Sequence, residues 1–318
     1  MSGSEISVII CTKNRFNDFK ETILSLVRQL CVPDELIVVD ASDQTGIDDY
    51  LTDADLPFKF KYFHTRPGLT HQRNHGIQNS TGSMLFFFDD DVILERDYIE
   101  RVHKVFESDL DHKIGAVGGR IRESKFADQV PFRMRLLRLR YEIYRLIFLE
   151  SRQGNGEFRF SGMPTHPHDL DTSRYVECLS GCCMAFRREV FFKTGFDENL
   201  KGYAVMEDAD ISKQVLNTGY LIYYEASAIL EHKTSPHDRL NEKELAETRV
   251  MNYAYLFRKN WPQTWPRILS FYWILLGMFL IHLRQPAARH GVMEGIRRSM
   301  REKNSMKNKP SLPQDKQE

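Results

Sequence analysis

The amino-acid sequence predicts an α/β protein with a Rossmann-like, mixed but mostly parallel central sheet flanked by helices, followed by a C-terminal helical appendage. Three observations predict this class. Apolar runs alternate with helical stretches through the first 120 residues, which is the pattern of βαβ units. The 318 residues are enough for one large α/β domain and an appendage. From about residue 240 the alternation is lost and the chain contains long helical stretches instead.

The first 120 residues contain short apolar runs that we interpret as buried strands. A strand, a helix and a second strand at this spacing predict parallel pairing. The predicted elements are a strand at 6–11, a helix capped by Asn17 or Asp18 and ending at Leu30, strands at 36–39 and 58–64, a helix at 70–79, a strand from Met84, a helix at 98–106 and a strand at 114–118.

Composition and missing motifs exclude several functions. The 44 basic and 44 acidic residues cancel, so no overall charge indicates nucleic-acid binding. Neither GxGxxG nor GxxxxGK[ST] occurs, so the dinucleotide fingerprint and the P-loop are both absent. The polar start of the chain leads directly into a strand, and we expect no signal peptide.

The five cysteines are odd in number and scattered, which fits a reducing compartment better than a disulfide framework. A zinc site from Cys178, Cys182 and Cys183 with His166 or His168 is an alternative. Its spacing matches no paired CxxC arrangement, so we interpret the cysteines as small buried apolar residues.

The chain changes character after residue 126. Pro131–Glu150 contains five arginines among apolar residues and predicts a basic amphipathic helix, which either covers the core or lies on an anionic surface. Residues 151–174 are rich in Gly, Pro, His and Ser and predict a long loop, often a functional lid. Further elements are predicted at 176–187, 189–194, 206–217, 220–224, 228–231 and 240–259.

An apolar run at 268–281 is shorter than the ~20 residues that cross a bilayer. It predicts either a packing helix or one that lies in a membrane surface. The aromatic residues Trp261, Trp265, Tyr272 and Trp273, together with the basic segment that follows, favour membrane association of 268–283. We expect residues 306–318 to form a disordered basic tail.

The stretch 84–94 joins a buried strand to three carboxylates, Asp89, Asp90 and Asp91. If the strand continues to Asp91, Asp89 and Asp91 point the same way and Asp90 points away. Two carboxylates at the carboxyl end of a central strand suit Mg²⁺ or Mn²⁺, and open α/β sheets bind their ligands at that edge. The alternative is an acidic turn that caps the next helix.

A second acidic group, Glu207, Asp208 and Asp210, opens the helix predicted at 206–217. Carboxylates in a first turn stabilise a helix dipole, which is the simpler interpretation. The order of the surrounding segments argues for more. In sequence they are 8–15, 38–42, 72–76, 88–91, 179–188, 195–198, 207–210, 219–220 and His232.

This ordered set resembles the family 2 glycosyltransferases, a large and mainly inverting group with the GT-A fold, over about residues 6–235. The opening strand and turn end in Thr12-Lys13-Asn14-Arg15, and Phe88-Asp89-Asp90-Asp91 takes the place of the Asp-x-Asp motif. Two departures are a short turn after Asp40, which leaves base selectivity open, and the Cys182-Cys183 pair where small residues are usual.

The resemblance implies a site for a nucleotide-diphosphate sugar and for Mg²⁺ or Mn²⁺. Asp89 would contact the ribose or the metal, Asp91 the metal, and His232 would be a further ligand, although a lone His is more often structural. Arg15 and Arg73 would meet phosphate oxygens. The implied nucleotide-sugar set is Thr12, Arg15, Asp40, Ser42, Arg73, Asp89 and Asp90.

The resemblance also implies the acceptor chemistry. Asp208, with Glu207 beside it, would be the general base that takes a proton from an acceptor hydroxyl during a single displacement with inversion. A lipid-linked or cell-envelope glycan would suit the hydrophobic C-terminal segment, at the cytoplasmic, inner face of the cell membrane. Residues 1–120 would be the nucleotide-binding half and 121–240 the acceptor half of one GT-A domain, with C-terminal helices at 241–305.

Three rival interpretations stay open on the residues alone. A sugar-phosphate nucleotidyltransferase shares the broad fold, but its Gly-rich triphosphate loop has no counterpart in Thr12–Asn17. A non-catalytic membrane-associated scaffold would have no reason to combine the two acidic groups with His232. A metal-dependent phosphohydrolase would need His/Asp clusters that are missing.

Overall fold

The computed structural model of the protein describes residues 5–44, 46–122, 154–167, 169–200, 202–233, 235 and 240–307, the last six of them by their backbone only. The chain divides into two compact units, Met1–Arg239 and Leu240–Glu318. The helix predicted at 131–150 lies outside the described residues, as does the part of the predicted tail beyond Lys307.

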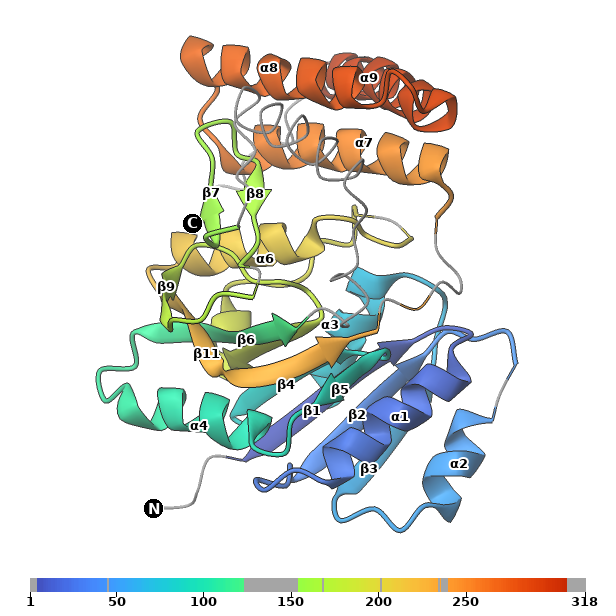
Figure 1. Cartoon of the computed structure of the whole chain (residues 1–318), viewed down its shortest axis with the longest axis vertical. Helices are drawn as coiled ribbons and strands as arrows, with labels where there is room; N and C mark the ends of the chain where they lie inside the picture. Colours follow the sequence, from blue (N-terminus) through green and yellow to red (C-terminus); the bar gives the residue numbers. More distant parts are fainter. Residues whose placement is uncertain are drawn as a thin grey trace, which may run out of the picture. The chain divides into compact units, whose positions relative to one another are not determined.

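The first unit is organised around a nine-stranded sheet, shown in Figure 1. The strands lie in the order β3, β2, β1, β4, β10, β6, β11 and β5, and β9 pairs with β11. Their bounds are β1 Ile6–Thr12, β2 Glu35–Asp40, β3 Lys59–His64, β4 Met84–Asp89, β5 Val92–Leu94, β6 Ile114–Arg122, β9 Arg174–Val176, β10 Cys183–Arg187 and β11 Leu221–His232.

The sheet is parallel in its N-terminal half and mixed beyond it. β1 runs parallel to β2 and β4, and β2 runs parallel to β3, because a crossover connection brings the chain back to the same edge each time. β10 is antiparallel to both β4 and β6, while β6 and β11 are parallel again. The predicted α/β class with a mixed central sheet is confirmed.

Helices cover both faces of this sheet. Their bounds are α1 Phe16–Val27, α2 Ile47–Asp53, α3 Leu69–Asn79, α4 Tyr98–Ser108, the short 3₁₀ helix η2 Arg188–Phe192 and α6 Glu207–Asn217. Core side chains of α1, α2 and α4 pack on one face, and those of α3 and α6 pack on the other. The sequence did not predict α2.

Two apolar cores explain why the strands of the sequence are continuously apolar. Successive side chains of a strand point to opposite faces. Val8 and Ile10 therefore join one core while Ile9 joins the other, and Phe88 and Phe87 separate in the same way. With both faces covered, neither set of positions can be polar without loss of burial.

Helix α1 begins earlier than predicted. Its N-cap is Arg15, which makes no side-chain capping bond, so the prediction that Asn17 or Asp18 caps the helix is wrong. The turn before it explains the difference. Asn14 adopts a left-handed φ of 56°, and its N–H donates to Ser42 Oγ at 2.7 Å, which directs the chain into the helix before it reaches Asn17.

The acidic strand also differs from the prediction. β4 ends at Asp89, and Asp90 and Asp91 form a turn that leads into β5. The strand therefore does not continue to Asp91, and strand alternation cannot set the direction of that side chain.

The strands predicted at 220–224 and 228–231 are a single strand, β11. Its pairing with β6 shifts register between Glu225 and Ile229, which is the behaviour of a β-bulge. The irregularity interrupts the apolar pattern and made one strand resemble two.

The described part of the predicted loop 151–174 is not structureless. It contains the hairpin β7 (Glu157–Phe158) and β8 (Pro164–Thr165). The Gly156 N–H donates to Thr165 O at 2.7 Å, and Gly156 O accepts the Cys178 N–H at 3.0 Å. These backbone bonds attach the hairpin to the segment that precedes β10.

The second unit consists of α7 (Glu242–Asn260), α8 (Trp265–Ile281) and α9 (Pro286–Lys307). α7 and α9 approach closely because Gly291 and Gly295 face α7: a Cβ at either glycine would collide with backbone carbonyl oxygens of α7. Phe271 of α8 stacks on Phe257 of α7 with ring centroids 4.6 Å apart. Among the described residues, no helix has the length and apolar character to cross a membrane.

Candidate active site

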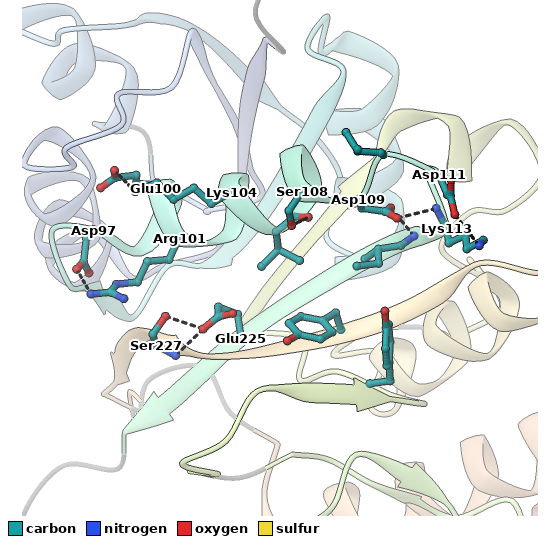
Figure 2. Close-up of a pocket in the computed structure, with 15 residues that line it drawn as sticks. Asp97, Glu100, Arg101, Lys104, Ser108, Asp109, Asp111, Lys113, Glu225 and Ser227 are labelled. Carbon is teal, nitrogen blue, oxygen red and sulfur yellow. Dashed lines mark hydrogen bonds and ion pairs between the residues drawn. The ribbon is translucent and has the colours of Figure 1, made fainter.

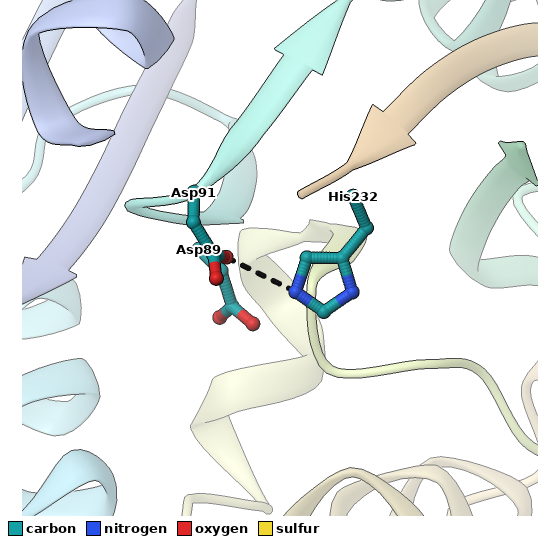
Figure 3. Close-up of side chains that lie close together, drawn as sticks. All are labelled: Asp89, Asp91 and His232. Carbon is teal, nitrogen blue, oxygen red and sulfur yellow. Dashed lines mark ion pairs between the residues drawn. The ribbon is translucent and has the colours of Figure 1, made fainter. Parts of the chain in front are cut away.

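Asp89, Asp91 and His232 form one cluster at the carboxyl end of β4, shown in Figure 3. One ligand atom from each lies within 4.8 Å of the other two. Asp89 ends β4, Asp91 lies in the following turn, and His232 ends β11. The sequence predicted these three residues as a set, and the turn, not strand alternation, brings Asp91 to the side of Asp89.

The carboxylate of Asp91 is held from several directions. His232 Nε2 lies 3.0 Å from Asp91 Oδ1, and the Ser235 N–H donates to Oδ2 at 2.8 Å. Burial acts to raise the pKa of Asp91, but His232, Ser235 and Arg15 outweigh it and lower the pKa. Asp91 is therefore charged in its buried position.

The donor set fits a divalent cation. Two carboxylates and one imidazole supply the oxygen and nitrogen ligands that Mn²⁺ accepts, and Mg²⁺ accepts the carboxylates. Asp91 is 1% exposed while Asp89 is 32% exposed, so the cluster has a rigid inner side and an open outer side. Among the described residues this is the one cluster of His, Cys, Asp or Glu that could hold a metal ion.

Asp90 has different partners from its two neighbours. Its carboxylate accepts from Thr12 Oγ1 at 2.7 Å and from Arg15 at 3.1 Å, and it is 3% exposed. Burial raises the pKa of Asp90 to about 7 against the opposing effects of Arg15 and Thr12. Contact of Thr12, Arg15 and Asp90 with a nucleotide stays a prediction, and in the structure Thr12 and Arg15 both donate to Asp90.

Asp40 is likewise buried and fully engaged. It is 0% exposed, and its carboxylate accepts from the Ser42 N–H at 2.8 Å and from Tyr62 Oη at 2.9 Å. These bonds fix the short turn after β2. Because Asp40 has no exposed surface, its predicted contact with the nucleotide would require the groups that cover it to move.

A hollow of about 490 Å³ lies beside that turn, with Asn14, Phe16, Ser42 and Asp43 in its wall. Asn14 Nδ2 donates to Asp43 at 2.9 Å, and Asn14 Oδ1 accepts the Asp43 N–H at 3.0 Å. The hollow has the size of a small-molecule site. The sequence named Ser42 but missed Asn14 and Asp43, although the short polar turn was a visible signal.

Arg73 links the two acidic groups. It is 2% exposed and donates to Asp89 at 3.2 Å and to Gly181 O at 2.8 Å, while its other terminal nitrogen pairs with Glu207. Burial alone lowers the pKa of Arg73, but Glu207 and Asp89 raise it above the ordinary value. The predicted phosphate contact of Arg73 stays a prediction, because its donors are directed at protein groups.

Glu207 and Asp208 begin α6, and their pKa values are shifted in opposite directions. Burial raises the pKa of Glu207, Arg73 opposes this, and Asp208 adds to it, which leaves the pKa at about 8. Burial also acts to raise the pKa of Asp208, but His166 and two backbone N–H groups lower it below the ordinary value. The surroundings therefore favour the charged form of Asp208 and disfavour that of Glu207.

The carboxylate of Asp208 is oriented by three groups. The Gly181 N–H donates to Oδ2 at 3.0 Å and the Ala209 N–H donates to Oδ1 at 2.8 Å. His166 Nε2, from the segment after β8, lies 3.2 Å from Oδ2. The sequence named His166 only as an alternative zinc ligand and missed this contact, because nothing local connects position 166 to position 208.

The turn at Gly181 needs a glycine because a Cβ there would lie 2.5 Å from Glu207 Oε1. The neighbouring cysteines serve packing: Cys182 and Cys183 are 3% and 1% exposed and belong to the core. Cys178 is also buried, while His168 lies outside the described residues.

A larger hollow, of about 970 Å³, lies elsewhere between α4 and β11 and is shown in Figure 2. Its charged side chains pair locally: Asp97 with Arg101 at 2.7 Å, and Asp111 with Lys113 at 2.7 Å. It contains none of the predicted site residues. The carboxyl ends of β1, β2 and β4, where open sheets bind ligands, carry the candidate site instead.

The known sequences that resemble this chain are glycosyltransferases. The family model described as Glycosyl transferase family 2 matches residues 7–194. The glucosyl-dolichyl phosphate glucuronosyltransferase of Haloferax volcanii is 28% identical over 240 residues, which are 72% of this chain and 69% of that protein. The uncharacterized glycosyltransferase YwdF of Bacillus subtilis is 27% identical over 104 residues, 33% of this chain and 39% of that protein.

Solved structures share the fold at low identity. TarS 1–349 of S. aureus has a TM-score of 0.54 at 15% identity, and the match covers 88% of this chain and 73% of the TarS chain. The mannosyltransferase PcManGT of Pyrobaculum calidifontis, in complex with GDP-Man and Mn²⁺, has a TM-score of 0.54 at 18% identity, covering 94% and 75%. GalNAc-T7 with UDP, GalNAc and Mn²⁺ has a TM-score of 0.59 at 15% identity, covering 96% and 57%. The predicted GT-A fold is confirmed.

Proposed function

The chain belongs to glycosyl transferase family 2 and is a glycosyltransferase, and we propose that it moves a hexosyl or deoxyhexosyl group from a nucleoside-diphosphate sugar to a hydroxyl acceptor. The reaction we propose is a metal-assisted single displacement with inversion. Family membership decides against the sugar-phosphate nucleotidyltransferase and the phosphohydrolase, and the paired acidic groups leave the scaffold interpretation without support.

One observation carries the mechanistic proposal. Arg73 contacts Asp89 of the carboxylate-imidazole cluster and Glu207 beside Asp208 at the same time. A cluster suited to a diphosphate-bound cation and an ionised, oriented carboxylate are thereby joined through one buried side chain. Departure of a diphosphate and deprotonation of an attacking hydroxyl are the two tasks of sugar transfer, and each has its own carboxylate here.

On the donor side, we propose that Asp89, Asp91 and His232 hold Mg²⁺ or Mn²⁺. When bound, such an ion is a Lewis acid that neutralises the leaving diphosphate. Asp91 gives the cluster its fixed geometry because it is held by Ser235, while the half-buried Asp89 would face the ligand. The hollow beside Asn14 and Asp43 would receive the nucleoside. Complexes of PcManGT and GalNAc-T7 with Mn²⁺ support the choice of ion.

On the acceptor side, Asp208 takes the proton of the acceptor hydroxyl while that oxygen attacks the anomeric carbon from the face opposite the diphosphate. The new C–O bond forms as the bond to the diphosphate breaks, and the anomeric centre inverts. The lowered pKa of Asp208 keeps it ionised and able to accept a proton. Glu207 pairs with Arg73 and does not itself need to exchange a proton.

For the acceptor we propose a lipid-linked or cell-envelope glycan, used at a membrane surface. The name of the Haloferax volcanii relative, a transferase that acts on a glucosyl-dolichyl phosphate, supports this class. So does α8, where Trp265, Leu269, Trp273 and Leu276 recur at helical spacing and are 73%, 59%, 43% and 44% exposed.

We propose that this face of α8 lies in the headgroup region of the cytoplasmic leaflet, as a peripheral contact. Tryptophan prefers the membrane interface, and Arg267 in the first turn of α8 and Arg284 shortly after its end would complement anionic lipids. The triple variant Trp265→Ser/Leu269→Ser/Trp273→Ser should lose cosedimentation with anionic phospholipid vesicles. Met300→Ser, at an exposed position of α9, is the control. Equal binding by both variants would refute the membrane contact.

The donor assignment is tested by calorimetry with UDP, GDP and dTDP, each with and without Mn²⁺, followed by turnover of the corresponding nucleotide sugars. We expect one diphosphate to bind in a Mn²⁺-dependent manner and its sugar nucleotide to release that diphosphate. Failure of all three diphosphates to bind, in a protein whose circular dichroism shows it to be folded, would refute the proposed function.

A further inference from the structure

Asp208 receives one side-chain partner from a segment that none of the recognised motifs includes. His166 follows β8, 42 residues before Asp208 in the chain, and its Nε2 lies 3.2 Å from Asp208 Oδ2. The two other groups that contact this carboxylate, the N–H groups of Gly181 and Ala209, are backbone donors. His166 is therefore the partner of the base that a side-chain substitution can remove.

The hairpin that carries His166 is attached independently of this contact. Gly156 pairs with Thr165 across the hairpin, and Gly156 O accepts the N–H groups of Glu177 at 2.5 Å and Cys178 at 3.0 Å. The Phe158 N–H also donates to the Glu177 carboxylate at 2.6 Å. The chain then continues to Gly181, so the His166 and Gly181 partners of the base are carried by one connected piece of backbone.

The position of His166 suits a role at the site more than a role in the core. Its side chain is 30% exposed and that of Asp208 is 17% exposed, so both side chains keep part of their surface accessible while the Nε2 atom at the contact is buried. The contact adds little apolar burial, and the hairpin already has its backbone bonds. What the contact does supply is an imidazole nitrogen 3.2 Å from Oδ2, and a protonated imidazole at that distance favours the charged form of the carboxylate.

We propose that His166 is a positioning residue for the general base: an N–H at Nε2 holds Oδ2 of Asp208, which fixes the other carboxylate oxygen toward the acceptor hydroxyl and couples the β7–β8 hairpin to the base. The inference rests on the proposed function, because it assigns Asp208 the proton transfer. His166 acts through Asp208 and makes no bond to the sugar.

A series of substitutions tests the proposal. His166→Gln places an amide nitrogen near the position of Nε2, whereas His166→Asn is too short and His166→Ala has no donor. We expect kcat for release of nucleoside diphosphate, with water as the acceptor, to fall about 10- to 100-fold in the Ala and Asn variants. The Gln variant should recover most of the rate. Affinity for the diphosphate with Mn²⁺ should stay within about twofold of wild type in all three, because donor contacts are untouched.

The controls separate this inference from the proposed function. His290→Ala, at an exposed position of α9, should leave kcat unchanged, and thermal melts should show all variants folded. Wild-type kcat within about twofold in the Ala variant would overturn the positioning role, as would equal losses in all three variants. If wild type itself shows neither binding nor turnover, the proposed function fails.

A second measurement does not depend on turnover. In ¹⁵N-histidine NMR spectra, the imidazole signal that disappears in His166→Gln should report a protonated Nε2, and it should move in Asp208→Asn. An unmoved signal would refute the contact itself, whatever the activity.

Discussion

The proposed donor side and the proposed acceptor side of the site are assembled in different ways. On the donor side, Asp89 and Asp91 lie within three residues at one strand end, and only His232 comes from a distant strand. On the acceptor side, Asp208 is held by Gly181, which lies 27 residues away in sequence, and by His166. The donor side is a local structure with one addition, whereas the acceptor side is a convergence of separate segments.

The difference shows which parts of the chain fix the geometry of the metal cluster and which fix that of Asp208. A divalent cation binds carboxylate oxygens, and the end of one strand with the turn that follows is enough to bring two carboxylates together. A general base has to meet one hydroxyl at hydrogen-bond distance, and around the proposed base Asp208 the structure places two backbone N–H groups and the imidazole of His166. Adjacent carboxylates on both sides, Asp90 with Asp91 and Glu207 with Asp208, allow this comparison to be tested.

Asp208→Asn should have the largest effect. The variant keeps the shape of the side chain but cannot take up the proton, so transfer should fall by about 10²- to 10⁴-fold, while calorimetric affinity for the diphosphate with Mn²⁺ stays unchanged. The wild-type rate should persist as pH falls and decline only below the usual titration range of an aspartate, because the pKa of Asp208 is lowered. Normal turnover in the Asn variant would remove Asp208 from the mechanism.

Asp91→Asn should have the next largest effect, confined to the donor side. The buried carboxylate is the fixed member of the cluster, and its loss should weaken Mn²⁺ affinity by at least about 100-fold. The matched control is Asp90→Asn. Because the pKa of Asp90 is raised to about 7, an amide resembles the half-protonated carboxyl, and Mn²⁺ affinity should hardly change. Equal losses of Mn²⁺ affinity in the two variants would show that the total negative charge of the three aspartates, and not the position of Asp91, sets the affinity.

Glu207→Gln should have the smallest effect on rate, within about tenfold of wild type, because a catalytic proton transfer would contribute more. Its effect on stability depends on pH. The pKa of Glu207 in the folded protein is about 8 and its ordinary value is 4.5, so the folded state binds the extra proton between these values. Wild type should therefore lose stability as pH rises from about 5 to 8, and the Gln variant should lose less.

Urea unfolding of the metal-free proteins at several pH values measures this difference. A parallel pH dependence in wild type and Glu207→Gln would show that Glu207 is ionised throughout. A rate loss as large as that of Asp208→Asn would show instead that Glu207 takes part directly in the proton transfer.

Much of the fold followed from the sequence because its signals are local. The apolar runs at 6–11, 36–39 and 84–89 became the parallel strands β1, β2 and β4, since a strand buried on both faces must be apolar at every position. The placement of β10 between β4 and β6 could not be predicted, because the periodicity of a strand does not identify its neighbours. The helix cap was misjudged for the same kind of reason: the Asn14 contact with Ser42 crosses between two loops.

The sequence by itself determined the parts of this protein that a few consecutive residues specify: the acidic strand end at Asp89, the acidic start of α6 at Asp208, and the family to which their order belongs. Only the tertiary structure decided the partners of these residues. The buried side chain of Arg73 contacts both Asp89 and Glu207, and His166 lies beside Asp208. A sequence lists which side chains can carry charge, but their pKa values and orientations depend on burial and on neighbours that chain folding brings together.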